Sequence, residues 1–196
     1  IDVSEVWAGG GSLVRIDPGG ALKVGPESAG ADPGPACYGR GGREPTVTDA
    51  NVLLGYLNSQ ALAGGSVPID IDAAREAVCD RIAGPLGRDL VETAYGIHLV
   101  ANTNMMRALK AVTTNRGRDT RDFVMFAFGG LGGVHAASLA RTLRVRRIVV
   151  DPLEVGVQRR HPVAGLDRGE EPWVGVVGGG GGRRHRVVGL PLAQRP

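Results

Sequence analysis

The amino-acid sequence predicts an α/β fold, and three observations along the chain support this prediction. A stripe of apolar residues recurs every three or four positions between residues 89 and 115, as in a long amphipathic helix. Phe123–Phe128 is apolar along its length, as a buried parallel strand is, and a glycine-rich turn and the helical segment Val134–Leu143 follow it. Arg147–Val150 is expected to be a second buried strand, so the order strand, turn, helix, strand predicts a parallel βαβ unit.

The N-terminal part of the chain begins with a predicted hairpin. Ser12–Ile16 and Ala21–Val24 are short β-like runs on either side of Asp17-Pro18-Gly19-Gly20, which is a turn sequence. The segment 25–45 that follows is rich in glycine and proline. Loops of this length inside a domain are usually functional or disordered.

Capping residues predict where three helices begin. Thr48 with Asp49 is expected to cap a short helix that extends to about Tyr56. Asp72 is expected to open a second helix, and Asp89 is the expected cap of the long one.

Length and cysteine content exclude several classes of protein. The 196 residues are enough for one domain, or one domain with an appendage, and the first residue, Ile1, suggests a fragment. No run of about 18 apolar residues occurs, so we expect no membrane span. Cys37 and Cys79 have no CxxC partner, which argues against a disulfide scaffold or a zinc ribbon and favours the cytoplasm.

The positive net charge belongs to the C-terminal end of the chain. Up to Leu153 the chain has 16 basic and 16 acidic residues, whereas from Glu154 onward it has 7 arginines and 4 acids, which gives the net +3. Nucleic-acid binding would require basic residues gathered on one element with aromatic residues between them. The first 153 residues show no such cluster, so we expect no nucleic-acid partner.

Two glycine-rich segments are the candidate binding sites. The turn with Gly129, Gly130 and Gly132 follows a predicted parallel strand, where bare backbone and a helix N-terminus can approach a ligand. Its spacing fits neither the dinucleotide fingerprint nor the Walker loop. His135 lies just inside the next helix, either as a packing or capping residue or as part of a site. Gly9, Gly10, Gly11 and Ser12 form the second segment, which is alternatively a flexible entry to the hairpin.

Other polar residues give weaker signals. Asn102 and Asn104 fall within the long helix, where asparagine is a poor helix former, and either one points into a site or both are solvated. Cys37 has no neighbouring histidine or lysine in sequence, so little supports a nucleophilic thiolate. No catalytic triad, carboxylate pair or metal-ligand spacing stands out, and the catalytic residues stay unidentified.

Several ordered motifs resemble the hydantoinase A / 5-oxoprolinase family over roughly residues 1–153. The most specific is residues 24–39, VGPESAGADPGPACYG, which is close to a family signature along its whole length. The others, in chain order, are GGGS at 9–12, PTVTDAN at 45–51, VANTNMMRA at 100–108, and RGRDTRDF at 116–123 leading into AFGG at 127–130.

The resemblance implies part of an actin-like, ribonuclease H-like ATPase fold. Family members use ATP with Mg²⁺ to phosphorylate the carbonyl of a lactam or hydantoin ring before water opens it, and related members are subunits of acetone-type carboxylases. By resemblance, Gly129, Gly130, Gly132 and His135 would lie at the nucleoside, and Gly9–Ser12 nearer the phosphate or substrate. A cyclic amide substrate and a hydantoinase B-type subunit or domain are the implied partners.

Three departures from the family pattern bear on activity. Leu131 replaces a small residue and Gly133 replaces a proline. The family's Asp-x-Gly-Gly-Thr phosphate-binding turns belong upstream of residue 1. We therefore expect a partial ATPase domain at 1–153 that does not turn over substrate alone, with a non-catalytic fragment as the alternative.

The composition changes at residue 154 to a Gly- and Arg-rich tail. Gly178–Gly182 followed by Arg183-Arg184-His185-Arg186 shows no hydrophobic period. The tail 154–196 is therefore predicted to be irregular, either as a disordered segment or as the product of a frameshift.

Overall fold

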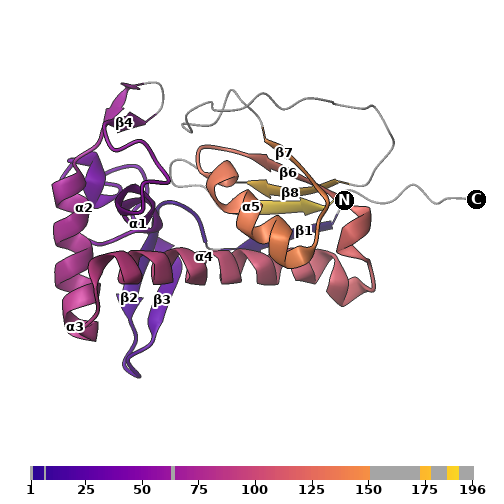
Figure 1. The fold of residues 1–196 in the computed structure, drawn as a ribbon, viewed down its shortest axis with the longest axis horizontal. Coiled ribbons are helices and arrows are strands. Elements are labelled where there is room, and N and C mark those ends of the chain that lie inside the picture. The colour runs from indigo at the N-terminus through magenta and orange to yellow at the C-terminus, as the bar shows by residue number, and fades with distance from the viewer. Residues whose placement is uncertain (1, 7, 63–64, 151–172, 178–184, 190–196) are drawn as a thin grey trace, which may run out of the picture.

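The computed structural model describes residues 2–6, 8–62, 65–150, 173–177 and 185–189. Two groups of elements lie side by side, and the long helix α4 (Leu90–Val112) runs along both (Figure 1). One group contains a hairpin and short helices, and the other contains a five-stranded sheet with one helix packed on it.

The five-stranded sheet has the order β1-β9-β8-β6-β7. Strand β6 pairs in parallel with both β7 and β8, whereas β9 pairs antiparallel with β8 and β1. Phe128 at the end of β6 is in register with Val177 at the end of β8. The strand bounds are β1 (Asp2–Val6), β6 (Val124–Phe128), β7 (Arg147–Val150), β8 (Trp173–Val177) and β9 (His185–Gly189).

The predicted βαβ unit is confirmed, but β7 is exposed or part-exposed instead of buried, because it lies at the edge of the described sheet. Helix α5 (Gly132–Leu143) connects β6 to β7 and starts two residues earlier than expected, because Gly132 and Gly133 already have helical backbone. One apolar core joins α4, α5 and β6, and its buried members include Met105, Leu109, Met125 and Leu139. This core fixes the turn between β6 and α5 in place.

The tail differs in part from the irregular segment that its composition predicts. Residues 173–177 and 185–189 form β8 and β9, which lie between β1 and β6 in the sheet. Both runs contain two or three valines, which favour strands, and the backbone of a strand pairs without any helical hydrophobic period. The other residues after Val150, including Gly178–Gly182, lie outside the described residues.

The N-terminal hairpin is confirmed, with β2 (Ser12–Ile16) and β3 (Leu22–Ser28) antiparallel. Asp17 closes its turn, because Asp17 Oδ1 accepts hydrogen bonds from Gly19 N and Ala21 N at 3.0 and 2.9 Å. The hairpin packs on α4, where Val14 and Val24 join Ile97 and Ala101 in a second apolar core.

Two short helices begin earlier than their predicted caps. Helix α1 (Val47–Leu53) has Thr46 as its N-cap instead of Thr48, because Thr46 and Asp49 bond to each other's backbone in a capping box. Helix α2 (Ile71–Val78) begins after Asp70, whose side chain accepts a hydrogen bond from Ala73 N. The helix predicted to reach Tyr56 ends at Leu53. Sequence spacing alone did not distinguish between neighbouring capping residues.

Short elements complete the first group. A π-helical turn (Cys79–Ala83) joins α2 to α3 (Gly84–Leu86), and β4 (Ala61–Leu62) pairs with β5 (Val67–Pro68). A 3₁₀ turn occupies Ala36–Tyr38 in this group, and the 3₁₀ turns Thr114–Arg116 and Thr120–Asp122 lie between α4 and β6.

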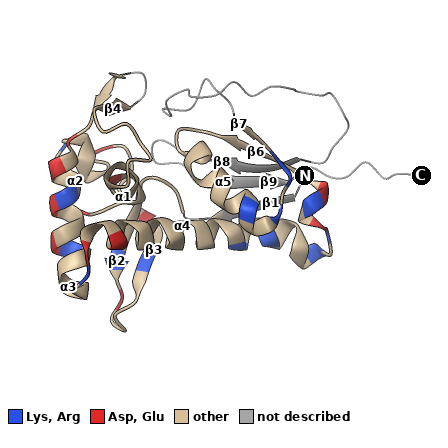
Figure 2. Cartoon of the chain, viewed as in Figure 1, with Lys and Arg blue, Asp and Glu red and all other residues tan. Residues whose placement is uncertain are grey.

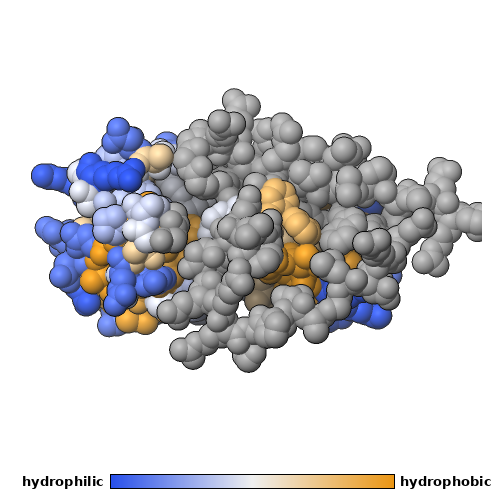
Figure 3. Space-filling model, turned by 90° about the horizontal axis from the view of Figure 1, so that it is seen from above, coloured by the Kyte–Doolittle hydropathy of each residue, from blue (hydrophilic) through white to orange (hydrophobic). Residues whose placement is uncertain are grey.

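Helix α4 begins where its cap predicts. Asp89 Oδ1 accepts hydrogen bonds from Val91 N and Glu92 N, and the helix ends at Val112, three residues before the predicted limit. Within the described residues, no helix is both long and apolar enough to span a membrane. Along α2 and the π-helical turn that follows it, acidic and basic residues are interspersed (Figure 2). In the view from above, hydrophilic residues gather at the ends of the molecule (Figure 3).

Candidate functional site

The structure brings the two predicted glycine-rich segments together. Gly10 lies against Leu131 of the turn that follows β6, so closely that a Cβ atom on Gly10 would overlap with Leu131 Cδ1. The same Cβ would lie 2.7 Å from Thr48 Oγ1 at the start of α1. Segments that are about 120 residues apart in sequence therefore form one corner of the molecule.

The turn after β6 exposes bare backbone. Gly129 has a φ of 84°, a conformation that favours glycine, and Gly130 is exposed. A Cβ atom on Gly130 would meet no atom within 4 Å. No side chain caps the N-terminus of α5, which begins at the buried Gly132. The turn thus combines open space, accessible main chain and the positive end of a helix dipole.

The Gly9–Ser12 segment is mostly buried, and hydrogen bonds between its first and last residues fix its conformation. Ser12 Oγ accepts a hydrogen bond from Gly9 N at 2.9 Å, and Ser12 N donates to Gly9 O. Gly10 O accepts from Thr48 N at 2.9 Å, and Gly11 O accepts from Ala29 N. The segment therefore anchors the hairpin and α1 beneath the β6–α5 turn, and only Gly11 in it is partly exposed.

Asp49 organises the long Gly/Pro loop. Its carboxylate is fully buried and accepts hydrogen bonds from Thr46 N and Oγ1 at 2.8 and 2.7 Å, and from Cys37 N at 2.7 Å. A longer bond comes from Ala36 N at 3.3 Å. Burial, followed by the charge of Asp49, raises the pKa of the Cys37 thiol. Cys37 is therefore held as a neutral thiol in the core, which agrees with the lack of sequence support for a nucleophile.

His135 is a buried residue at the start of α5. Its side chain is 1% exposed, and its Nδ1 lies 2.7 Å from Asn102 Oδ1 on α4. Burial, with a smaller contribution from His98, lowers the pKa of His135 to about 3. His98 stacks on it with ring centroids 4.9 Å apart, and burial lowers the pKa of His98 as well. Both imidazoles are therefore neutral at pH 7.

Asn102 is buried, which excludes the alternative that both helix asparagines are solvated. The Nδ2 atom of Asn102 lies 2.9 Å from Nε2 of His98. The other ring nitrogen of His98, Nδ1, lies 2.9 Å from Oδ1 of Asn51 on α1. Asn104 instead donates to Val24 O on the hairpin at 3.2 Å. His98 and Asn51 were not among the site residues predicted from the sequence. The i, i+4 spacing of His98 and Asn102 on one helix face was the signal for His98. The signal for Asn51 was its place at the end of the PTVTDAN motif at 45–51.

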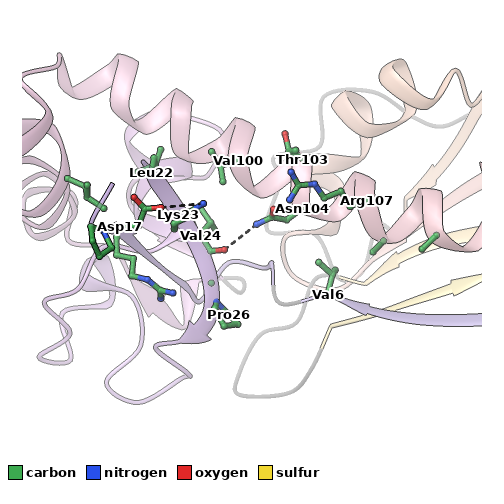
Figure 4. A pocket seen from close by; sticks show the side chains of 16 residues that line it. Val6, Asp17, Leu22, Lys23, Val24, Pro26, Val100, Thr103, Asn104 and Arg107 are labelled. Carbon is green, nitrogen blue, oxygen red and sulfur yellow. Dashed lines mark hydrogen bonds and ion pairs between the residues drawn. The ribbon is translucent and has the colours of Figure 1, made fainter. Parts of the chain in front are cut away.

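A separate open cleft lies between the hairpin and α4. It has a volume of about 880 Å³ and is lined by β2, β3, Val6 and one face of α4 (Figure 4). Lys23 Nζ forms an ion pair with Asp17 Oδ2 at 3.4 Å across its wall, and Arg107 lies on its α4 side. Asn104 lines this cleft, but neither of the two glycine-rich segments nor His135 does, so the cleft is distinct from the β6–α5 turn.

The described residues do not provide a metal site. Across the part of the chain that the structure describes, no group of three His, Cys, Asp or Glu side chains is placed to hold an ion. The corner around Gly10 and the β6–α5 turn offers main-chain groups and a hydroxyl, which fit an organic ligand better than a cation.

Comparison with known proteins gives a consistent result. The family described as hydantoinase/oxoprolinase matches residues 1–159. The chain is 44% identical over 157 residues to the caprolactamase subunit alpha of Pseudomonas jessenii, and 47% identical over 136 residues to the acetophenone carboxylase gamma subunit of Aromatoleum aromaticum. It is 38% identical over 167 residues to 5-oxoprolinase 1 of Arabidopsis thaliana.

The matches cover most of this chain and a small part of each relative. They span 80%, 69% and 76% of this chain, but 23%, 19% and 13% of the three relatives, in the order given above. The crystal structure of the ATP-dependent caprolactamase from Pseudomonas jessenii superposes with a TM-score of 0.70 at 44% identity, over 76% of this chain and 22% of that one.

Proposed function

This chain belongs to the hydantoinase/oxoprolinase family, and from that membership we propose that it forms the nucleoside-binding part of an ATP-dependent enzyme. The proposed reaction is the hydrolysis of a lactam or hydantoin ring after phosphorylation of its carbonyl oxygen. ATP would supply the phosphoryl group that turns a poor electrophile into one that water can attack. The observation that carries the proposal is the open, bare turn between β6 and α5.

Gly129, Gly130 and Gly132 are the proposed nucleoside contacts. Adenosine requires close approach to the main chain, and a Cβ atom on Gly130 would occupy the space that such a ligand would take. Gly9–Ser12 and His135 belong to the same proposed site, mainly as its supporting layer, because most of these residues are buried. The role of the chain's own residues is therefore to bind and orient the nucleoside.

The remaining parts of the active site are proposed to come from elsewhere. Residues 1–153 would be one part of a larger ATPase domain, and a hydantoinase B-type subunit or domain would contribute to ring opening. The phosphate-binding turns and the ligands of Mg²⁺ would lie on those parts. Cys37 and Cys79 are both free thiols, which favours a reducing compartment such as the cytoplasm.

A second candidate function is that of a subunit of an ATP-dependent carboxylase. The 47% identity to an acetophenone carboxylase subunit supports it as directly as the caprolactamase match supports ring hydrolysis. Both candidates need the same nucleoside corner. They differ in the carbonyl substrate, a ketone in one case and a cyclic amide in the other.

Nucleotide binding by the purified chain tests the proposal. Isothermal titration calorimetry with ADP should detect binding to the wild type, and Gly130→Val should abolish it, because the two added methyl groups would occupy the proposed adenosine space. The variant should keep its stability, since Gly130 borders open space. Gly96→Ala on α4, where the new Cβ atom would make an ordinary 3.7 Å contact with Leu22, is the control and should bind as the wild type does.

Turnover by the isolated chain is the second measurement. We expect no ATP hydrolysis with 5-oxoproline, caprolactam or hydantoin, because the phosphate-binding part is absent from these residues. Equal ADP binding by wild type and Gly130→Val would overturn the nucleoside site. Failure of the wild type to bind ADP or ATP at millimolar concentration would favour a non-catalytic fragment.

A further inference from the structure

Four buried polar side chains form a continuous hydrogen-bonded relay across three helices. The relay consists of Asn51 on α1, His98 and Asn102 on α4, and His135 on α5, and each is at most 4% exposed. Its three contacts measure 2.9, 2.9 and 2.7 Å in the order Asn51–His98, His98–Asn102 and Asn102–His135. Such a network is costly to bury unless its members satisfy one another.

The direction of each bond follows from the central amide. Asn102 Nδ2 can only donate, so His98 Nε2 accepts and the proton of His98 sits on Nδ1, which donates to Asn51 Oδ1. Asn102 Oδ1 can only accept, so the proton of His135 also sits on Nδ1. Both histidines are thus fixed as neutral Nδ1–H tautomers.

The relay ends in a complementary pair of free atoms. Asn51 Nδ2 is a donor and His135 Nε2 is an acceptor, and these are the two buried side-chain polar atoms without a hydrogen-bond partner in the described part of the chain. The imidazole rings of His98 and His135 are stacked with an interplanar angle of 14°, and Asn51 bonds to the edge of one of them. Both free atoms therefore belong to groups at this stack, because His135 is one of its rings and Asn51 bonds to the other.

We propose that Asn51 Nδ2 and His135 Nε2 hold one water molecule between them, so that the four side chains close into a ring that positions α5 against α1. A water molecule accepts one hydrogen bond and donates another, which matches the two free atoms, and buried waters commonly satisfy such groups. Leu131, four residues before His135, lies on Gly10. By holding α5, the ring also sets the position of the β6–α5 turn. That this position matters for nucleoside binding rests on the proposed function of the turn.

Nuclear magnetic resonance of the ¹⁵N-labelled full chain at pH 7 tests the ring without any nucleotide. Long-range ¹H–¹⁵N spectra should show both imidazoles neutral with the proton on Nδ1. Rotating-frame cross-relaxation should connect the Asn51 amide protons and His135 Hε1 to a single long-lived water. A proton on Nε2 of either ring would overturn the relay, and absence of the water contact would overturn its closure.

Matched serine variants test the positioning role. Asn51→Ser should shift the His135 Nε2 resonance and the amide resonances of Gly129, Gly130 and Gly132, although Asn51 is distant from them in sequence. Asn104→Ser, the same substitution at an asparagine of α4 outside the ring, should leave them unchanged. Equal effects of the two variants, or no shift in either, would overturn the positioning role. A confirmed ring in a chain that binds no ADP would contradict the proposed function alone.

Discussion

Leu131 packs directly on Gly10, and this contact joins the β6–α5 turn to the loop that leads into the hairpin. The space between the two residues admits no Cβ atom at position 10. The start of α1 adds Thr48 to the same contact. A glycine near the N-terminus is thus required by a leucine that follows it by about 120 residues.

Gly10→Ala is expected to lower the free energy of unfolding by about 1–3 kcal/mol, because Leu131 must move to admit the methyl group. Adding Leu131→Ala should recover part of the loss, since the overlap with Cδ1 disappears while Thr48 Oγ1 stays close. Urea unfolding of the two single variants and the double variant measures this coupling. Strictly additive effects would contradict the contact.

Asp49→Asn is expected to cost about 2–3 kcal/mol of stability, because an amide N–H₂ would replace one carboxylate oxygen that faces the backbone donors of Cys37 or Thr46. Asp70→Asn is the matched control. Asp70 is exposed and caps α2 through one bond from Ala73 N, and asparagine is an equally good N-cap. Equal urea midpoints for the two variants would show that Asp49 is not the centre of the loop.

Stability should fall as the pH is lowered from about 6.5 to 5. The pKa of His135 is lowered to about 3 in the folded protein, so only the unfolded chain takes up its proton in this range. The unfolded state then binds more protons, and the free energy of unfolding decreases by up to about 1.4 kcal/mol per pH unit for each such histidine.

His135→Asn should make this pH dependence shallower, although it lowers stability at every pH. The pKa values of Asp17 and Glu27 are also lowered, by a backbone hydrogen bond first in each case, so their contribution is lost at lower pH than the histidine window. Urea midpoints between pH 5 and 7.5 give the slope. A slope unchanged by His135→Asn would mean that His135 titrates normally.

A chain that ends at Leu153 should lose much of its sheet order, because β8 and β9 separate β1 from β6 in the sheet. Without them, β6 presents an unpaired edge and β1 has no neighbouring strand. Hydrogen exchange should show the amides of β6 unprotected on the β8 side, and size-exclusion chromatography should show association. Unchanged protection in residues 124–128 would show that the tail is a dispensable appendage.

The elements with strong periodic patterns were predictable. The stripe on α4 and the continuous apolar run of β6 are local signals, because burial of one face or of both faces repeats along the chain itself. Asp89 was identified as a cap because no competing side chain stands beside it. At α1 and α2 several capping residues are neighbours, and packing against the rest of the fold decides between Thr46 and Thr48, or Asp70 and Asp72.

The amino-acid sequence by itself determined the α/β class, the βαβ unit, the glycine turn after β6 and the resemblance of the ordered motifs to a family. Only the tertiary structure decided that Gly10 meets Leu131 and that Asn51, His98, Asn102 and His135 form one relay. It also decided that residues 173–177 and 185–189 enter the sheet. The physical reason is that periodicity records which face of an element is buried, whereas contacts between distant segments depend on shape and on the direction of hydrogen bonds, which no local pattern encodes.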